Sequence, residues 1–178
     1  MEQLILVDNK DNQVGLAEKM LVHQSGMLHR AFSIFVFRKH QDSLQLLLQK
    51  RHSDKYHSGG LWTNSCCGHP SNGETIVSAA KRRLTEELGI HIDLDYLNYF
   101  IYKHTFINNL TEHELDHVLV GLYKDDQEII PNPVEIEDFK WIDLATLEQE
   151  LLNFKEQFTV WLPLAYNIIK NNLKNLWL

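Results

Sequence analysis

The sequence GHPSNGETIVSAAKRRLTEELGI, residues 68–90, joins a turn-rich start to a charged helical pattern. Its apolar residues recur at helical spacing, which predicts a helix over residues 74–88. Ser71 and Glu74 have the spacing of a capping box, and Gly89 stands where a helix commonly ends. This stretch therefore predicts a loop, a helix and a second loop in succession.

The same predicted helix places cations and carboxylates beside one another. Arg82, Arg83, Glu86 and Glu87 lie within little more than one helical turn. Carboxylates are ligands of Mg²⁺, and arginines together with that cation bind a diphosphate. Taken alone, however, such charges more commonly belong to a solvated helix face, so the helix by itself leaves both interpretations open.

The spacing of residues 68–90 resembles the Nudix box, which has the form G-x5-E-x7-R-E-U-x-E-E-x-G-U. Every defined position matches except that Arg83 stands where the box has Glu. This match favours a diphosphate site over a solvated helix face. Nudix hydrolases use several box carboxylates to bind metals and position water, so a cation at this place favours binding a diphosphate without cutting it. The resemblance implies one Nudix-type domain over residues 1–178.

The rest of the chain shows strand and helix patterns that do not alternate strictly. Runs rich in β-forming residues predict strands at 4–7, 31–37, 44–49, 61–64, 96–106, 115–123 and 134–142. Helical spacing predicts two C-terminal helices, at 144–152 after an Asp143 cap and at 158–176 with a kink near Pro163. We therefore expect an α/β (α+β) fold, a single compact domain in which helical layers cover a mixed β-sheet.

Charge and cysteine content narrow the classes of partner. The formal net charge is −7, whereas nucleic acid and anionic membrane surfaces favour basic proteins. No apolar run approaches the roughly 18 residues that span a bilayer. Cys66 and Cys67 are the only cysteines, and adjacent cysteines rarely satisfy disulfide geometry. We expect a cytoplasmic monomer or weak dimer with reduced thiols, a small-molecule partner, and no nucleic-acid or membrane partner.

Three histidines and two carboxylates could share a metal ion. His23, His29 and His69 lie in separate segments, and Glu112 and Glu114 are two residues apart, so they face the same side of an extended strand. Such a mixed nitrogen and oxygen set suits Mg²⁺, Mn²⁺ or Zn²⁺. Spacing alone does not establish the site, because a surface or capping histidine is the commoner case. The other histidines we interpret as surface or structural: His40, His52, His57, His91, His104, His113 and His117.

A second resemblance extends over most of the chain. The stretch TNSCCGHP at residues 63–70, the modified Nudix box, the Glu112-His113-Glu114 segment and Trp161 together resemble type I isopentenyl-diphosphate isomerases, in register from about residue 4 to 165. The resemblance implies interconversion of isopentenyl and dimethylallyl diphosphate in isoprenoid biosynthesis. The reaction is a 1,3-allylic proton shift through a tertiary carbocation. The resemblance also implies that one Mn²⁺, Mg²⁺ or Zn²⁺ is held by the three histidines and two glutamates named above.

The resemblance also assigns the acid and the base, which lie on opposite faces of the flat substrate in this family. Cys67 matches one, and Glu114, bound to the metal and paired with Tyr102, matches the other. Which of them acts first in the forward direction stays open. Trp161 matches an aromatic residue that faces the carbocation, although core packing is the simpler role for a tryptophan. Cys66 should point away from Cys67 in an extended segment, so we interpret it as a packing residue.

The diphosphate group of the substrate is expected to bind lysine and arginine side chains and a second metal ion. The resemblance implies that Mg²⁺ bridges the phosphate oxygens and Glu87. Each lysine or arginine taken alone is more often a solvated charge. The residues that match phosphate-facing cations are Lys19, Arg51, Lys55 and Arg82, with Arg83 as a possible substitute for Arg82.

Two other functions remain as alternatives. A Nudix hydrolase of a nucleoside or sugar diphosphate would keep the fold, but it needs the missing box glutamate and gives Cys67 no role. A non-catalytic metal-binding or diphosphate-binding module would leave the set of Cys67, Tyr102 and Glu114 unexplained.

Overall fold

Strand β3 (His29–His40) is the centre of a nine-stranded mixed sheet in a computed structural model that describes residues 2–173 and 176. One edge of β3 pairs in parallel with β8 (Thr111–Tyr123), from His29 opposite Glu114 to Arg38 opposite Tyr123. The other edge pairs in turn with three antiparallel strands, which are β1 (Gln3–Val7), β6 (Cys66–Gly68) and β4 (Ser43–Arg51). Residues from four distant segments therefore meet along one strand.

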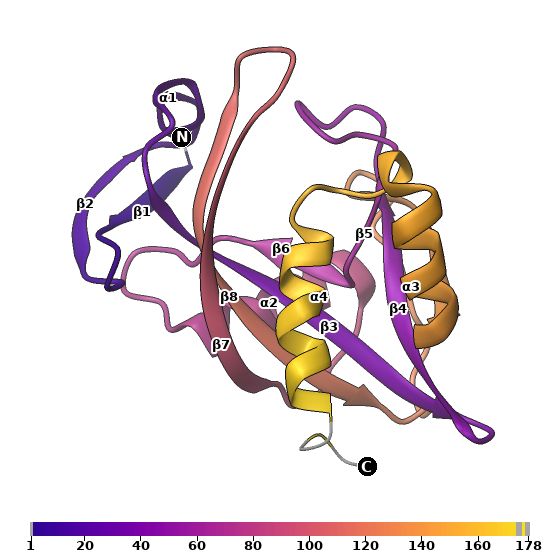
Figure 1. Cartoon of the computed structure of the whole chain (residues 1–178). Coiled ribbons are helices and arrows are strands. Elements are labelled where there is room, and N and C mark those ends of the chain that lie inside the picture. Colours follow the sequence, from indigo (N-terminus) through magenta and orange to yellow (C-terminus); the bar gives the residue numbers. More distant parts are fainter. Residues whose placement is uncertain (1, 174–175, 177–178) are drawn as a thin grey trace.

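The remaining strands extend the sheet at its edges. Strand β2 (Gln13–Glu18) pairs with β1, and β7 (Asp95–Thr105) pairs with β8. Strands β5 (Trp62–Thr63) and β9 (Ile136–Asp143) both pair with β4. Figure 1 shows β7 and β8 as a long hairpin whose tip projects beyond the neighbouring strands, on the side where α1 (Lys19–Ser25) lies.

Helices cover both faces of the sheet, and the alternation of side chains along β3 explains how. Phe32, Ile34 and Val36 point to one face and pack with α2 (Ile76–Leu88). Phe35 and Phe37 point to the other face, in a second cluster with residues of α3 (Leu144–Asn153) and α4 (Leu162–Asn172). In Figure 1, α4 crosses in front of the sheet and α2 lies behind it. The predicted fold class, a mixed sheet between helices, is confirmed.

Helix boundaries differ from the sequence prediction at two places. Thr75, whose hydroxyl accepts from the Ser78 amide, caps α2 instead of the predicted Ser71 box, although the Glu74 carboxylate does accept from the Ser71 amide. Gly89 ends α2 as predicted, with a left-handed φ of 68° that suits glycine.

The last helix begins at Leu162, with Pro163 in its first turn, so the proline marks a helix start and the predicted kink is wrong. The predicted end of this helix includes residues 174–175, which lie outside the described part of the chain. The sequence prediction also missed β2, the short α1 and the 3₁₀ turn Lys155–Gln157. Across residues 2–173 and 176, no helix has the length and apolar character needed to cross a membrane.

Candidate active site and metal centre

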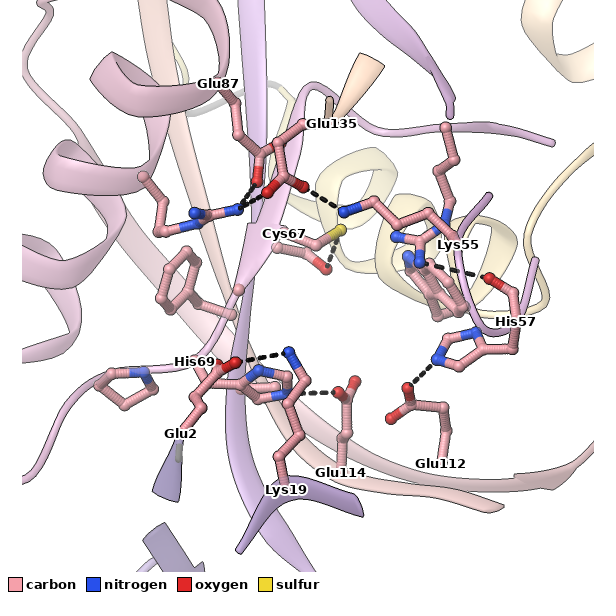
Figure 2. A pocket seen from close by; sticks show the side chains of 18 of the residues that line it. Glu2, Lys19, Lys55, His57, Cys67, His69, Glu87, Glu112, Glu114 and Glu135 are labelled. Atoms are coloured by element: carbon pink, nitrogen blue, oxygen red, sulfur yellow. Dashed lines mark hydrogen bonds and ion pairs between the residues drawn. The ribbon is translucent and has the colours of Figure 1, made fainter. Parts of the chain in front are cut away.

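A cavity of about 360 Å³ opens where β3 changes from apolar to polar residues. The face of β3 that carries Phe35 and Phe37 further along begins with His29, Ala31 and Ser33. Figure 2 shows that the side chains around the cavity come from many segments. The sequence-predicted residues that line it are Lys19, Arg51, Lys55, Cys67, His69, Arg82, Glu87, Tyr102, Glu112, Glu114 and Trp161. The two other predicted residues, His23 and His29, are fully buried and contact the lining glutamates.

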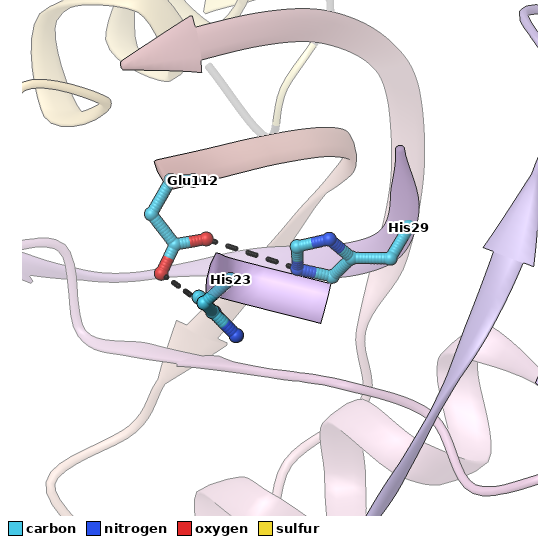
Figure 3. A group of neighbouring side chains, drawn as sticks. All are labelled: His23, His29 and Glu112. Atoms are coloured by element: carbon cyan, nitrogen blue, oxygen red, sulfur yellow. Dashed lines mark hydrogen bonds and ion pairs between the residues drawn. The ribbon is translucent and has the colours of Figure 1, made fainter. Parts of the chain in front are cut away.

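The five predicted metal ligands form one cluster. Nε2 of His23 lies 3.2 Å from Oε1 of Glu112, and Nε2 of His69 lies 3.1 Å from Oε1 of Glu114. His29 lies between them, with Nε2 at 3.7 Å from Oε2 of Glu112 and 3.5 Å from Oε1 of Glu114. Figure 3 shows His23 and His29 both facing the Glu112 carboxylate. The cluster thus consists of two groups of three residues that share His29, and in each group the ligand atoms lie within 4.8 Å of one another, close enough to bind one metal ion. The first group contains His23 and Glu112, and the second contains His69 and Glu114.

The donor atoms of this cluster fit a divalent cation. Nδ1 of His23 donates to the Lys19 carbonyl at 2.6 Å, and Nδ1 of His29 donates to the Met27 carbonyl at 3.0 Å. Because a carbonyl can only accept, these bonds leave Nε2 as the atom that can offer its lone pair to a metal. Nε2 of His29 and Oε2 of Glu112 are buried without a hydrogen-bond partner in the described part of the chain. Buried polar atoms of this kind are satisfied when a metal binds.

His57 lines this cavity and is buried, so of its two predicted roles, surface or structural, the surface one is wrong. Its side chain is buried, and its Nε2 lies 2.5 Å from Oε1 of Glu112. The imidazole stacks on Phe106 with ring centroids 4.5 Å apart, and it meets the Trp161 ring edge-on at 6.0 Å. Burial raises the pKa of Glu112, but the neighbouring His23 and then His57 outweigh it, so the net pKa lies well below the usual value.

The two cysteines face opposite sides of the sheet, as predicted from their extended segment. Cys66 is fully buried in the cluster that packs on α2. Cys67 pairs with Ser33 of β3 and lines the cavity. Both thiols are free. Burial is the main cause that raises the pKa of Cys67 to about 12, so this thiol keeps its proton at neutral pH.

Asn64 holds the Cys67 thiol, and sequence reasoning did not single it out. Its side-chain amide nitrogen donates to the carbonyls of Ile34 at 3.2 Å and Cys66 at 2.8 Å. The amide oxygen must therefore face the other way, and it accepts from the Cys67 thiol at 3.1 Å and from the Thr63 hydroxyl at 2.9 Å. Asn64 is fully buried, so these bonds fix the direction of the S–H group.

Glu114 and Tyr102 form a pair next to an aromatic wall. The Tyr102 hydroxyl donates to Oε2 of Glu114 at 2.7 Å, on the oxygen that His69 does not contact. Trp161 is buried at the start of α4, and its ring centroid lies 6.5 Å from that of Tyr102. The Arg51 guanidinium lies over the same indole, 5.3 Å from its centroid. The cavity thus carries a carboxylate, a hydroxyl and a large aromatic surface close together.

The predicted phosphate-facing cations already have carboxylate partners, with one exception. Lys19 pairs with Glu2 at 3.0 Å, and Lys55 pairs with Glu135. Arg82 donates two hydrogen bonds to Glu74, from Nε and from Nη2, each 2.9 Å long. This pairing is the main cause that lowers the pKa of Glu74 to about 2. Arg83, at the position where the Nudix box has Glu, pairs with Glu87, Glu86 and Glu135. Among the described residues Arg51 has no carboxylate partner.

Comparisons with known proteins establish the class of fold. Residues 27–162 match the family model of the NUDIX domain. A solved protein of Deinococcus radiodurans has a TM-score of 0.72 at 22% identity, covering 95% of this chain and 98% of that one. A Nudix hydrolase from M. smegmatis has a TM-score of 0.63 at 15% identity, covering 98% and 96%. The chain is therefore a NUDIX-domain protein.

Curated relatives identify the family within that class. The chain is 50% identical to isopentenyl-diphosphate Delta-isomerase 2 of Photorhabdus laumondii, over 93% of this chain and 91% of that protein. It is 44% identical to the isopentenyl-diphosphate Delta-isomerase of Photobacterium profundum, over 98% and 97%. The protein belongs to the isopentenyl-diphosphate Delta-isomerase family.

Proposed function

We propose that this protein interconverts isopentenyl diphosphate and dimethylallyl diphosphate in isoprenoid biosynthesis, as its relatives' names indicate. One observation carries the proposal: Cys67 of β6 and Glu114 of β8, which Tyr102 of β7 contacts, line one cavity. Figure 2 shows Cys67 and Glu114 on this cavity. Strands β6 and β8 flank β3 on its two edges. A flat five-carbon chain between them would meet a proton carrier on each side.

The reaction adds a proton to C4 of isopentenyl diphosphate and removes one from C2. Protonation leaves a tertiary cation at C3, and loss of the C2 proton forms the new double bond, so no proton is gained or lost overall. Because the reaction is reversible, Cys67 and Glu114 each donate in one direction and accept in the other. The Cys67 thiol carries its proton at neutral pH, and Tyr102 can relay or stabilise the proton on Glu114.

The cation at C3 needs an electron-rich surface that excludes water. Trp161 supplies this surface, because its buried indole faces the cavity next to Tyr102. A cation over a desolvated indole gains about 2 kcal/mol. Water that reached the cation would produce an alcohol, so an aromatic surface in place of water also protects the cation.

Two metal ions complete the site. The cluster of His23, His29, His69, Glu112 and Glu114 would hold one Mn²⁺, Mg²⁺ or Zn²⁺. When bound, that ion would supply positive charge that orients the Glu114 carboxylate. A second ion, Mg²⁺, would bind the diphosphate together with Glu87. The cations assigned to the phosphate oxygens are Lys19, Arg51, Lys55 and Arg82, and Arg83, which pairs with Glu87, could take the place of Arg82.

We further propose that residues 1–178 work as one isomerase domain, as a monomer or weak dimer, with no nucleic-acid or membrane partner. Two free thiols, one of them in the cavity, support a reducing compartment such as the cytoplasm.

Proton NMR of isopentenyl diphosphate in D₂O with enzyme and Mg²⁺ tests the function. We expect deuterium to enter the methyl and C2 positions, with no release of phosphate. Phosphate release without deuterium exchange would refute the isomerase and favour a Nudix hydrolase. Arg83 argues for deuterium exchange without phosphate release, because this residue, which pairs with Glu87, places a cation where a hydrolase needs a carboxylate.

A further inference from the structure

The lining of the cavity is electrically balanced. It contains five glutamates and five lysines and arginines. A diphosphate carries several negative charges, so it needs cations that are free to bind it. Most of the cations are engaged by carboxylates, as described above. A diphosphate that takes up any of these paired cations must therefore displace a carboxylate from it.

Glu135 is the residue at which this exchange can occur. One carboxylate oxygen pairs with Lys55, and the other lies 3.6 Å from Nη2 of Arg83. Figure 2 shows Glu135 beside Glu87, with Lys55 reaching it from across the cavity. Glu135 therefore holds two cations that border the diphosphate subsite, although no sequence motif assigns it a role.

The backbone keeps Glu135 in this place. The Asn132 amide donates to the Glu87 carbonyl at 2.8 Å, which ties the preceding turn to the end of α2. The His52 amide donates to the Glu135 carbonyl at 2.9 Å, which ties the residue to the loop that carries Lys55. The carboxylate is thus presented to both cations by a fixed main chain, and only its side chain needs to move.

We propose that Glu135 is an internal counterion of the diphosphate subsite. It holds Lys55 and Arg83 until a diphosphate arrives with its divalent cation and replaces the carboxylate as their partner. This role rests on the proposed function, because it takes the cavity to be the diphosphate site. Without the divalent cation, the displaced carboxylate and the incoming phosphate oxygens would repel each other at short distance. The divalent cation and the diphosphate should therefore bind cooperatively.

The same strand region offers a matched control. Glu137, two residues further on, pairs with Lys50 at 2.8 Å, and both side chains are partly exposed. Neither residue is among the described ones that line the cavity. Removing the Glu137 charge therefore breaks a comparable ion pair without freeing a cation for the diphosphate.

Calorimetric titration with inorganic pyrophosphate tests the proposal. The wild type, Glu135→Gln and Glu137→Gln are titrated with and without Mg²⁺, using protein that retains its tightly bound ion. Without Mg²⁺, we expect Glu135→Gln to bind pyrophosphate about tenfold more tightly than the wild type, about 1.4 kcal/mol. The increase in pyrophosphate affinity on adding Mg²⁺ should be about tenfold smaller in Glu135→Gln than in the wild type. Glu137→Gln should bind pyrophosphate as the wild type does, with and without Mg²⁺. Glu135→Ala is a second variant without the charge and should behave like Glu135→Gln.

The outcomes separate the two proposals. If Glu135→Gln binds Mg²⁺-free pyrophosphate no more tightly than the wild type, or less tightly, Glu135 is a structural ion-pair residue and the inference is wrong. If Glu137→Gln shows the same gain, the effect is one of net charge, and the specific role of Glu135 is again refuted. If no variant binds pyrophosphate even with Mg²⁺, the cavity is not a diphosphate site and the proposed function itself fails.

Discussion

Replacing Asn64 should be the most damaging single change near the Cys67 thiol. The Asn64 side chain makes four hydrogen bonds, two as donor and two as acceptor, and it is fully buried. A buried hydrogen bond contributes about 1 kcal/mol net, so Asn64→Ala should lower the free energy of unfolding by about 3 to 4 kcal/mol. For a domain of this size that corresponds to a fall of about 10 °C in Tm.

Thermal and urea unfolding measure this loss directly. Asn72→Ala is the matched control, because Asn72 is exposed and makes one side-chain contact, from Gln13 at 3.2 Å. We expect the control to change the unfolding free energy by less than about 0.5 kcal/mol. Below its Tm, Asn64→Ala should also turn over about tenfold more slowly, because the thiol has lost the acceptor that directs it. If Asn64→Ala is as stable as the control, the buried hydrogen bonds do not hold this segment and the argument is wrong.

Three further predictions concern the cavity. Cys67→Ala should abolish turnover in a steady-state assay while folding and metal content stay nearly intact. Cys66→Ala should keep turnover and lower the free energy of unfolding by about 1 kcal/mol. If instead Cys66→Ala loses turnover and Cys67→Ala keeps it, Cys66 is the reactive thiol. His57→Phe keeps a ring stacked on Phe106 but loses the nitrogen next to Glu112. Metal affinity, measured by competition with a chelator, should therefore fall about tenfold. An unchanged metal affinity would mean that His57 does not support the metal site. Trp161→Phe should lower kcat roughly tenfold with little change in KM, and an equal loss through KM would instead indicate a substrate-binding role.

Local patterns in the sequence were sufficient for some elements only. Helix α2 was predicted to within two residues, because its apolar spacing and its closing Gly89 are contained in one contiguous stretch. Strand β2 was missed because all of its residues are exposed or half-buried, and the only apolar alternation in it is the short pair of Val14 and Leu16. The last helix was placed too early, because Phe158, Val160 and Trp161 continue the apolar pattern although Pro163 favours a first-turn position.

The site could be predicted only where a family resemblance supplied what spacing lacks. The position of His29 opposite Glu114 depends on the pairing of β3 with β8, which lie far apart in the sequence. No local rule fixes that register. The resemblance named both residues, but it did not name His57. The burial of His57 depends on a loop that packs against Phe106, at the tip of the hairpin of β7 and β8, and no pattern within the loop itself indicates that contact.

The stretch around the two cysteines shows why its other residues matter as much as the thiol. Strand β6 pairs Ser33 with Cys67 and Ile34 with Cys66, so a slip of one residue would turn Cys67 into the core and Cys66 toward the cavity. Ser65 opposes such a slip, because its hydroxyl accepts from the Val36 amide at 2.8 Å and donates to the Leu47 carbonyl at 2.7 Å.

Gly68 opposes the same slip from the other end of β6. A Cβ atom at this position would lie 2.9 Å from Cζ of Phe32 and 3.2 Å from Cγ of Arg83, so any larger residue moved into this place would collide with the core. Together with the amide of Asn64, these contacts hold one register of the strand. Reactivity at Cys67 therefore depends on neighbours that carry no proton in the reaction, and substitutions at these positions should reduce turnover by misplacing the thiol.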